Sequence, residues 1–128
     1  MYEAVILASI IEKEASNNNS QPGISSVFHN RLREGIRLQS DATIVYFTGR
    51  DDFITSLADT EIDNPYNTYR IDGLTPTPIN SPGINSIKAA LYPETSDYYY
   101  FFYDKLGIVY YSRTFEEHSA KANEILTQ

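Results

Sequence analysis

The chain has 128 residues, no cysteine, 41% hydrophobic residues and a formal net charge of −7 at pH 7. This length suits one domain with a single core, and the lack of cysteine excludes disulfides, thiolate metal sites and a cysteine nucleophile. The negative charge argues against binding to nucleic acid or to an anionic membrane surface, since both require clusters of Lys and Arg. The longest apolar run, Ala4–Ala8, is too short to span a bilayer.

The first predicted element is a helix over Val5–Ser16, a stretch without Gly or Pro. Leu7, Ile10, Ile11 and Glu14 follow each other at i, i+3, i+4 and i+7, which places them on one helical face. A carboxyl group therefore falls within an apolar stripe.

Burial of an unpaired carboxylate among apolar side chains is unfavourable and usually raises its pKa. A carboxylic acid that stays protonated near neutral pH is what the cleavage of a glycosidic bond requires. The alternative is that Glu14 borders the stripe and is either solvated or paired with an arginine. Glu12 points about 200° away around the helix, so the two acids are expected to occupy different sites.

A second helix is predicted over Ile24–Glu34, after a polar loop that contains the breaker Pro22–Gly23. Gly35 provides its stop. Arg31 borders the apolar side and could reach a carboxylate, whereas Arg33 is expected to be a surface charge.

Leu38–Asp41 is predicted to be extended, with Ser40 or Asp41 capping a short helix that contains Ile44, Val45 and Phe47. A short helical or irregular piece is expected at Phe53–Leu57. The stretch Asp63–Gly83 is rich in Asn, Pro, Thr and Gly and is predicted to be a long loop. Such loops are often functional, and this one could line a groove.

Ser81 and Pro82 read as the N-cap and first residue of a third main helix, which ends at Pro93. Four of its residues are expected to face inward: Ile84, Ile87, Ala90 and Leu91.

The aromatic run Tyr98–Tyr103 and the segment Val109–Arg113 are predicted to be two strands joined by a turn at Asp104–Gly107. Thr114 and Glu117 form a capping box for a last helix. The residues of this helix expected to face inward are Phe115, Ala122, Ile125 and Leu126. The predicted class is α+β, with helices packed around a small antiparallel sheet.

Most catalytic and cofactor motifs are missing. His29 and His118 lie far apart without a metal-binding pattern, and we expect His118 to make a structural hydrogen bond. No serine-hydrolase, P-loop or dinucleotide motif is present. Acid chemistry from Glu14 remains, with Asp41 as a possible second carboxylate. Two carboxyl groups at a fixed separation would favour a hydrolase. A single carboxyl group would favour an intramolecular displacement.

Several linked motifs occur in one order along nearly the whole chain. They are Leu7–Glu14, Val27–Leu32, Arg37–Asp41, Tyr66–Tyr69, Gly73–Leu74 with Pro76 and Pro78–Ile79, Ser81–Gly83, and Ser112–Thr114 leading to Glu117–His118. In these motifs the chain resembles the catalytic domain of the MltG-type (YceG-like) endolytic murein transglycosylases.

The resemblance implies cleavage of the β-1,4 bond between N-acetylmuramic acid and N-acetylglucosamine without water, leaving a 1,6-anhydro end. It identifies Glu14, followed by Ala15, as the catalytic acid, and it implies a lysozyme-like arrangement around the first helix. Asp41 is expected to have an orienting or structural role. The residues expected to bind the glycan, or to position the loops and the acid, are Gln39, Tyr66, Asn67, Tyr69, Asn30 and Arg31.

The family also implies that residues 1–128 are the catalytic fragment of a longer, membrane-anchored protein that acts on the extracytoplasmic face of the bacterial membrane. Its partners would be glycan strands of peptidoglycan and the machinery of cell-wall synthesis. Neither a cofactor nor a metal is expected. An older family name, aminodeoxychorismate lyase, implies pyridoxal phosphate, but Lys13 and Lys88 are predicted to face solvent.

Four positions depart from the family pattern. Ala42 and Thr75 stand where the family has proline, Thr77 where it has glycine, and Val109 where it has a histidine. The last change weakens the expectation of substrate contacts from the final strand. Two alternatives stay open: a muramidase that uses water, and a non-catalytic module that binds cell-wall glycan.

Overall fold

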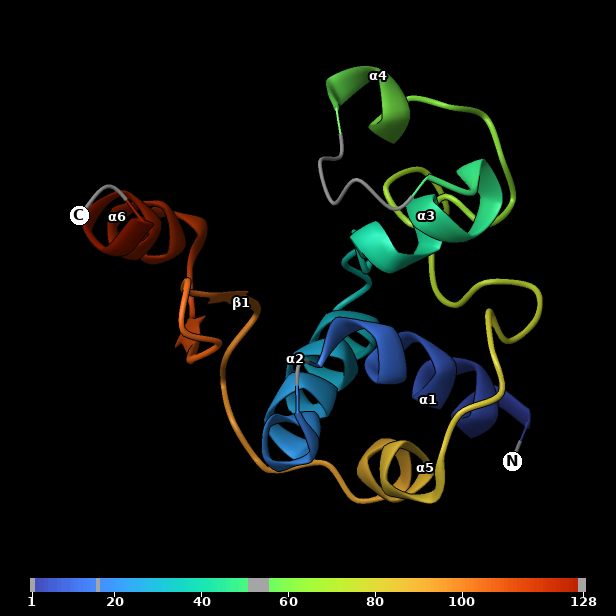
Figure 1. The fold of residues 1–128 in the computed structure, drawn as a ribbon, viewed down its shortest axis with the longest axis horizontal. Coiled ribbons are helices and arrows are strands. Elements are labelled where there is room, and N and C mark those ends of the chain that lie inside the picture. Colours follow the sequence, from blue (N-terminus) through green and yellow to red (C-terminus); the bar gives the residue numbers. More distant parts are fainter. Residues whose placement is uncertain (1, 16, 51–55, 127–128) are drawn as a thin grey trace.

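The computed structural model describes residues 2–15, 17–50 and 56–126. Within them the chain forms six α-helices, one 3₁₀ turn and one two-stranded sheet (Figure 1). In chain order these are α1 (Tyr2–Glu14), the 3₁₀ turn η1 (Asn18–Ser20), α2 (Gln21–Arg33), α3 (Asp41–Thr48), α4 (Leu57–Thr60), α5 (Ile84–Leu91), β1 (Tyr100–Tyr103), β2 (Val109–Ser112) and α6 (Phe115–Leu126). The predicted α+β class is confirmed.

Helices α1, α2 and α5 form the body of the molecule, with α3 and α4 on one side and the hairpin and α6 on another (Figure 1). Every residue from Ile6 to Ile11 is buried, because α1 packs against α2, α3 and α5. A helix that is apolar around its whole circumference belongs inside a core. The last turn of α1, which ends at Glu14, emerges from this packing.

Helix α2 starts at Gln21, so the prediction that Pro22 and Gly23 lie in a loop was wrong. Proline is tolerated in the first turn of a helix, where its missing N–H has no intrahelical partner. Gly23 allows close approach of the hairpin: a Cβ at this position would lie 2.1 Å from the hydroxyl oxygen of Tyr111.

Helix α5 begins two residues later than predicted, with Gly83 in place of Ser81 at the N-cap. The Glu12 carboxylate accepts hydrogen bonds from the Gly83 N–H (2.9 Å) and the Ser86 hydroxyl (2.8 Å). Glu12 and Glu14 therefore do occupy different sites. The expectation that Ile84 and Leu91 face inward was wrong, since Ile84 is 64% exposed. The buried face consists of Ser86, Ala89 and Ala90.

Strands β1 and β2 pair antiparallel, with Tyr100 opposite Ser112 and Tyr103 opposite Val109. The predicted turn between them is present, and Gly107 has the positive φ of 83° that glycine adopts readily. Val109, at the position of the family histidine, packs against the main core.

Helix α6 contacts the two strands, and none of its described residues is fully buried. The prediction that Phe115 and Leu126 face inward was therefore wrong; Phe115 is 60% exposed. The Thr114 hydroxyl accepts from the Glu117 N–H as expected, while the Glu117 carboxylate accepts from the N–H of Arg113.

The predicted loop Asp63–Gly83 contains turns and no regular helix or strand. Of the piece predicted at Phe53–Leu57, residues 53–55 lie outside the described part of the chain, as does Ser16. None of the described helices combines the length and apolar character that crossing a bilayer demands.

Candidate active site

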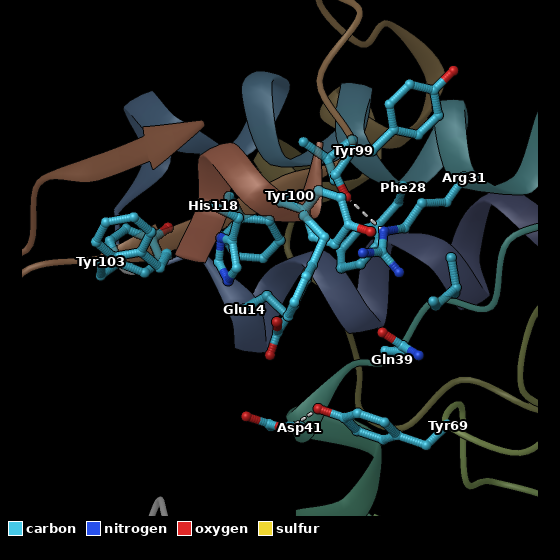
Figure 2. A pocket seen from close by; sticks show the side chains of 15 residues that line it. Glu14, Phe28, Arg31, Gln39, Asp41, Tyr69, Tyr99, Tyr100, Tyr103 and His118 are labelled. Carbon is cyan, nitrogen blue, oxygen red and sulfur yellow. Dashed lines mark hydrogen bonds between the residues drawn. The ribbon is translucent and has the colours of Figure 1, made fainter. Parts of the chain in front are cut away.

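A pocket of about 650 Å³ opens where the end of α1 meets α2, the segment before α3, the hairpin and α6. Its lining comprises Glu14, Val27, Phe28, Arg31, Leu38, Gln39, Asp41, Tyr69, Tyr99, Tyr100, Phe101, Phe102, Tyr103, Phe115 and His118. Figure 2 shows Glu14 between the aromatic residues of the hairpin on one side and Asp41 and Tyr69 on the other.

Glu14 is the last residue of α1, and its side chain is partly exposed to the pocket. Burial by the surrounding protein and, second, the charge of Asp41 together raise the pKa of its carboxyl group from 4.5 to about 7. The Ala42 N–H and the Ser40 hydroxyl partly oppose this increase. The carboxyl group can therefore hold or release a proton near neutral pH.

Asp41 and Tyr69 form a pair across the pocket from the hairpin. The Tyr69 hydroxyl donates to Asp41 Oδ1 at 2.5 Å. Burial and the neighbouring Asp41 carboxylate raise the pKa of Tyr69 above its usual value, so the phenol keeps its proton. Asp41 is thus held as a hydrogen-bond acceptor near Glu14, an arrangement that fits an orienting and electrostatic role.

Gln39 lines the same side of the pocket in a strained backbone conformation, with φ of 52°. A positive φ is uncommon outside glycine and occurs often at functional sites. The loop after α4 holds this conformation: the Gln39 N–H donates to the Thr68 carbonyl (3.1 Å), and the Ser40 N–H donates to the Thr68 hydroxyl (2.8 Å). The side chain of Gln39 is thereby presented to the pocket.

Arg31 lies beneath the hairpin and is buried. Its Nε donates to the Tyr99 carbonyl and its Nη1 to the Arg37 carbonyl, both at 2.7 Å. The guanidinium group also lies over the ring of Tyr100, 4.8 Å from the centroid. Arg31 therefore ties the hairpin to the segment that carries Gln39 and Asp41.

Asn30 does not line the pocket. Its amide donates to the carbonyls of Ser96 and Tyr98, both at 2.9 Å, and its oxygen accepts from Arg33. The side chain fastens the segment that leads into β1 onto α2. Arg33 is exposed, as expected of a surface charge, and its guanidinium takes part in this contact.

Tyr66 and Asn67, two expected glycan ligands, are also outside the pocket lining. Asn67 is fully buried, and its amide donates to the carbonyls of Thr60 and Ile62 while its oxygen accepts from the Tyr69 N–H. The Tyr66 hydroxyl bonds to Thr77 within the same loop. Both residues brace the loop that carries Tyr69.

Reasoning from the sequence did not identify the aromatic residues 99–103 or His118 as pocket residues. The run Tyr98–Tyr103 was interpreted as a strand, and its abundance of rings was the available signal. His118 was expected to be structural, yet it lines the pocket together with Glu14. No local pattern reveals this placement, because it depends on how α6 packs against the hairpin.

Cofactor and metal ligands are not gathered at this site. Lys13 and Lys88 are exposed, and neither lines the pocket. Across residues 2–15, 17–50 and 56–126, no three acidic or histidine side chains come together in a way that could hold a metal ion.

An α+β domain with a single acidic residue of raised pKa in an aromatic pocket is a type of site suited to glycoside cleavage. A family model described as YceG-like family matches residues 1–124, and the chain belongs to this family.

Relatives with known names support the same placement. The chain is 42% identical over 124 residues to the endolytic murein transglycosylase of Bacillus subtilis (strain 168), covering 97% of this chain and 34% of that protein. It is 38% identical over 128 residues to the endolytic murein transglycosylase of Streptococcus pneumoniae (strain R6), covering 95% of this chain and 23% of that protein. The chain thus spans about a third or less of these relatives.

A crystal structure of a yceG-like protein from Listeria monocytogenes superposes with a TM-score of 0.89 at 48% identity. The match covers 94% of this chain and 39% of that protein.

Proposed function

We propose that this chain is the catalytic part of an endolytic murein lytic transglycosylase, with Glu14 as its acid and base. The observation that carries the proposal is the position of Glu14: its carboxyl group lies at the end of a buried helix, in an aromatic-lined pocket, with a pKa raised to about 7. The names of the relatives support murein as the substrate.

In the proposed reaction, Glu14 donates its proton to the glycosidic oxygen as the bond from C1 of the muramic acid to that oxygen breaks through an oxocarbenium-like state. The Glu14 carboxylate then accepts the proton of the C6 hydroxyl, while O6 forms a bond to C1. The products are a free 4-hydroxyl on N-acetylglucosamine and a 1,6-anhydro muramic acid end. No water is consumed, and Glu14 returns to its protonated form.

The other pocket residues have supporting roles in this proposal. Gln39 and Tyr69 hydrogen-bond to the sugars, and Asp41 orients Tyr69 and keeps Glu14 protonated. Arg31 and Asn30 hold the hairpin in place, and Tyr66 and Asn67 act through the position of Tyr69. The full-length protein would act at the extracytoplasmic face of the membrane, held by segments outside this chain and near the machinery of cell-wall synthesis.

Substitutions of Glu14 and Glu12, both in the last turn of α1, provide a direct test of the acid. Glu14→Gln should lower cleavage of glycan strands by about 10²- to 10⁴-fold, the usual contribution of a general acid. Glu12→Gln is the matched control, because Glu12 contacts only the start of α5. If Glu14→Gln cleaves like the unaltered chain, Glu14 is not the acid; if the unaltered chain binds glycan and never cleaves it, the chain is a binding module.

A further inference from the structure

His118 lies in a box of three aromatic rings that opens to the pocket. Its imidazole stacks on Tyr100 with 5.3 Å between centroids, and Phe102 meets it edge-on at 5.6 Å. Phe115 lies 6.3 Å away at a tilt. The same imidazole lines the pocket together with Glu14 (Figure 2). Rings from β1 and α6 thus fix the plane of the imidazole.

The two ring nitrogens of His118 have different surroundings. Nδ1 is enclosed and has no hydrogen-bond partner among the described residues. An enclosed N–H without an acceptor is strongly unfavourable, so the proton of the neutral ring belongs on Nε2, the other nitrogen of this pocket-lining side chain. Burial and the nearby positive charge of Arg31 lower the pKa of His118, which keeps the ring neutral.

A neutral N–H donor beside apolar rings favours a particular kind of chemical group in a bound ligand. A carboxylate would find no positive charge on the imidazole, and the guanidinium of Arg31 is already engaged with the Tyr99 and Arg37 carbonyls and the Tyr100 ring. A sugar hydroxyl has no apolar part to contact the rings. An acetamido group has both features, because its methyl group is apolar and its carbonyl oxygen accepts one hydrogen bond.

We propose that His118, Tyr100, Phe102 and Phe115 form a recognition site for the N-acetyl group of the bound glycan. The methyl group lies in the pocket against these aromatic side chains, and His118 Nε2–H donates to the acetamido oxygen. The inference rests on the proposed function in one respect, namely that the substrate is a glycan of N-acetylated sugars. It makes His118 a determinant of specificity, since a buried donor left unpaired penalises a ligand without the acceptor.

Binding in the absence of turnover tests this role. The Glu14→Gln chain is titrated with the N-acetylglucosamine tetrasaccharide and with cellotetraose, which has the same backbone and no acetamido groups. We expect tighter binding of the N-acetylated sugar and a shift of the His118 ring resonances in NMR spectra. His29 is the internal control, because its Nε2 is paired with the Ala90 carbonyl and the residue is not part of the pocket lining.

Two substitutions separate the hydrogen bond from the packing. His118→Phe keeps a ring in the box without the donor and should reduce the preference for the N-acetylated sugar roughly tenfold, the contribution of one hydrogen bond. His118→Gln restores an N–H donor and should recover part of this preference. Unchanged amide spectra outside the pocket verify the fold of each variant.

Equal preference in His118→Phe and in the parent chain, or His118 resonances that stay fixed at saturation, would overturn the inference. Cleavage of murein by the unaltered chain is scored separately. Loss of discrimination in His118→Phe would support the N-acetyl site even if no cleavage occurred. Conversely, cleavage with unaltered discrimination would leave the transglycosylase proposal standing and remove this one.

Discussion

The carboxyl group of Glu14 is suited to both halves of the proposed reaction because its pKa lies near neutrality. A group that donates a proton early and accepts one later works best when neither form is strongly favoured. Burial in the pocket and the charge of Asp41 bring the pKa of Glu14 to this value. These same features weaken the folded state when Glu14 is ionised.

Glu14→Gln should stabilise the protein above neutral pH. The pKa of Glu14 is higher in the folded than in the unfolded chain, so its contribution to stability is fully present below pH 4.5 and is lost as the pH rises through 7. Glutamine stays neutral, and its gain at pH 8 should be about 1–3 kcal/mol. Urea unfolding at pH 8 and pH 4.5 measures this gain; equal differences at the two pH values would contradict it.

Asp41→Asn should shift the pH dependence of cleavage. Removal of the neighbouring negative charge lowers the pKa of Glu14, so the alkaline limb of kcat/KM, where Glu14 loses its proton, should move to lower pH. The asparagine oxygen can still accept from Tyr69, which limits structural disturbance. Rates on soluble glycan fragments across pH 5–9 provide the readout, and a limb that stays in place would exclude Asp41 as the source of the shift.

At the scale of single residues, Glu14 could be singled out from the sequence. The i, i+3, i+4, i+7 pattern placed it with Ile10 and Ile11, and the family motif identified the same residue. The surroundings of Asn67 and His118 could not be predicted. An asparagine that bonds to three backbone groups looks the same in a sequence as one that binds sugar. The rings around His118 come partly from β1, about 16 residues earlier in the chain.

At the scale of elements, a cluster of hydroxyl groups connects the long loop to the start of α3. The Thr68 hydroxyl accepts from the Ser40 N–H at 2.8 Å and lies 2.9 Å from the Thr43 hydroxyl. All three residues are buried. Their bonds hold the backbone that carries Gln39 and Asp41, so the loop is part of the structure that shapes the pocket.

Thr68→Val keeps the shape of the side chain and removes these bonds. The buried Ser40 N–H would lose its partner, which should lower the free energy of unfolding by about 1–3 kcal/mol. Displacement of Gln39 and Asp41 should reduce cleavage about ten- to hundredfold. Thermal unfolding and initial rates measure the two effects. Thr60→Val is the control, since that hydroxyl donates only to Leu57 within α4; full activity in Thr68→Val would refute the positioning role.

Glu12 stabilises the start of α5 through the Gly83 N–H and the Ser86 hydroxyl, and these bonds lower the pKa of Glu12. Its stabilisation is therefore present above pH 4.5 and is lost as the pH falls through the lowered folded pKa. Glu12→Gln should cost about 0.3–1 kcal/mol at pH 7 and less at pH 2.5. Chemical denaturation at both pH values checks this, and a cost that persists undiminished in acid would show that the charge is irrelevant.

The positions of helices and strands could mostly be predicted, whereas the buried faces of α5 and α6 could not. Apolar spacing shows that a helix has an apolar face but not which neighbour covers it. In α5 the close contact with α1 selects small residues such as Ala89 and Ala90, leaving Ile84 in solvent. In α6 only the thin hairpin lies underneath, so Phe115 remains exposed at the edge of the pocket.

On the scale of the whole molecule, the pocket is assembled from segments far apart in sequence. Arg31 bonds to the carbonyl of Tyr99, and Ser40 bonds to Thr68. The class of the fold follows from local patterns and composition, but these long-range contacts do not. Some of the family motifs were informative because they contain residues that the folded chain brings into the pocket with Glu14, such as Arg31, Gln39 and His118.

The most direct test of the central claim is the mass of the products released from intact glycan strands by the unaltered chain and by Glu14→Gln. Intramolecular displacement predicts muropeptides that are lighter than the hydrolytic products by one water and end in 1,6-anhydro muramic acid, all dependent on Glu14. Products that carry a reducing muramic acid end would contradict this account and identify a muramidase.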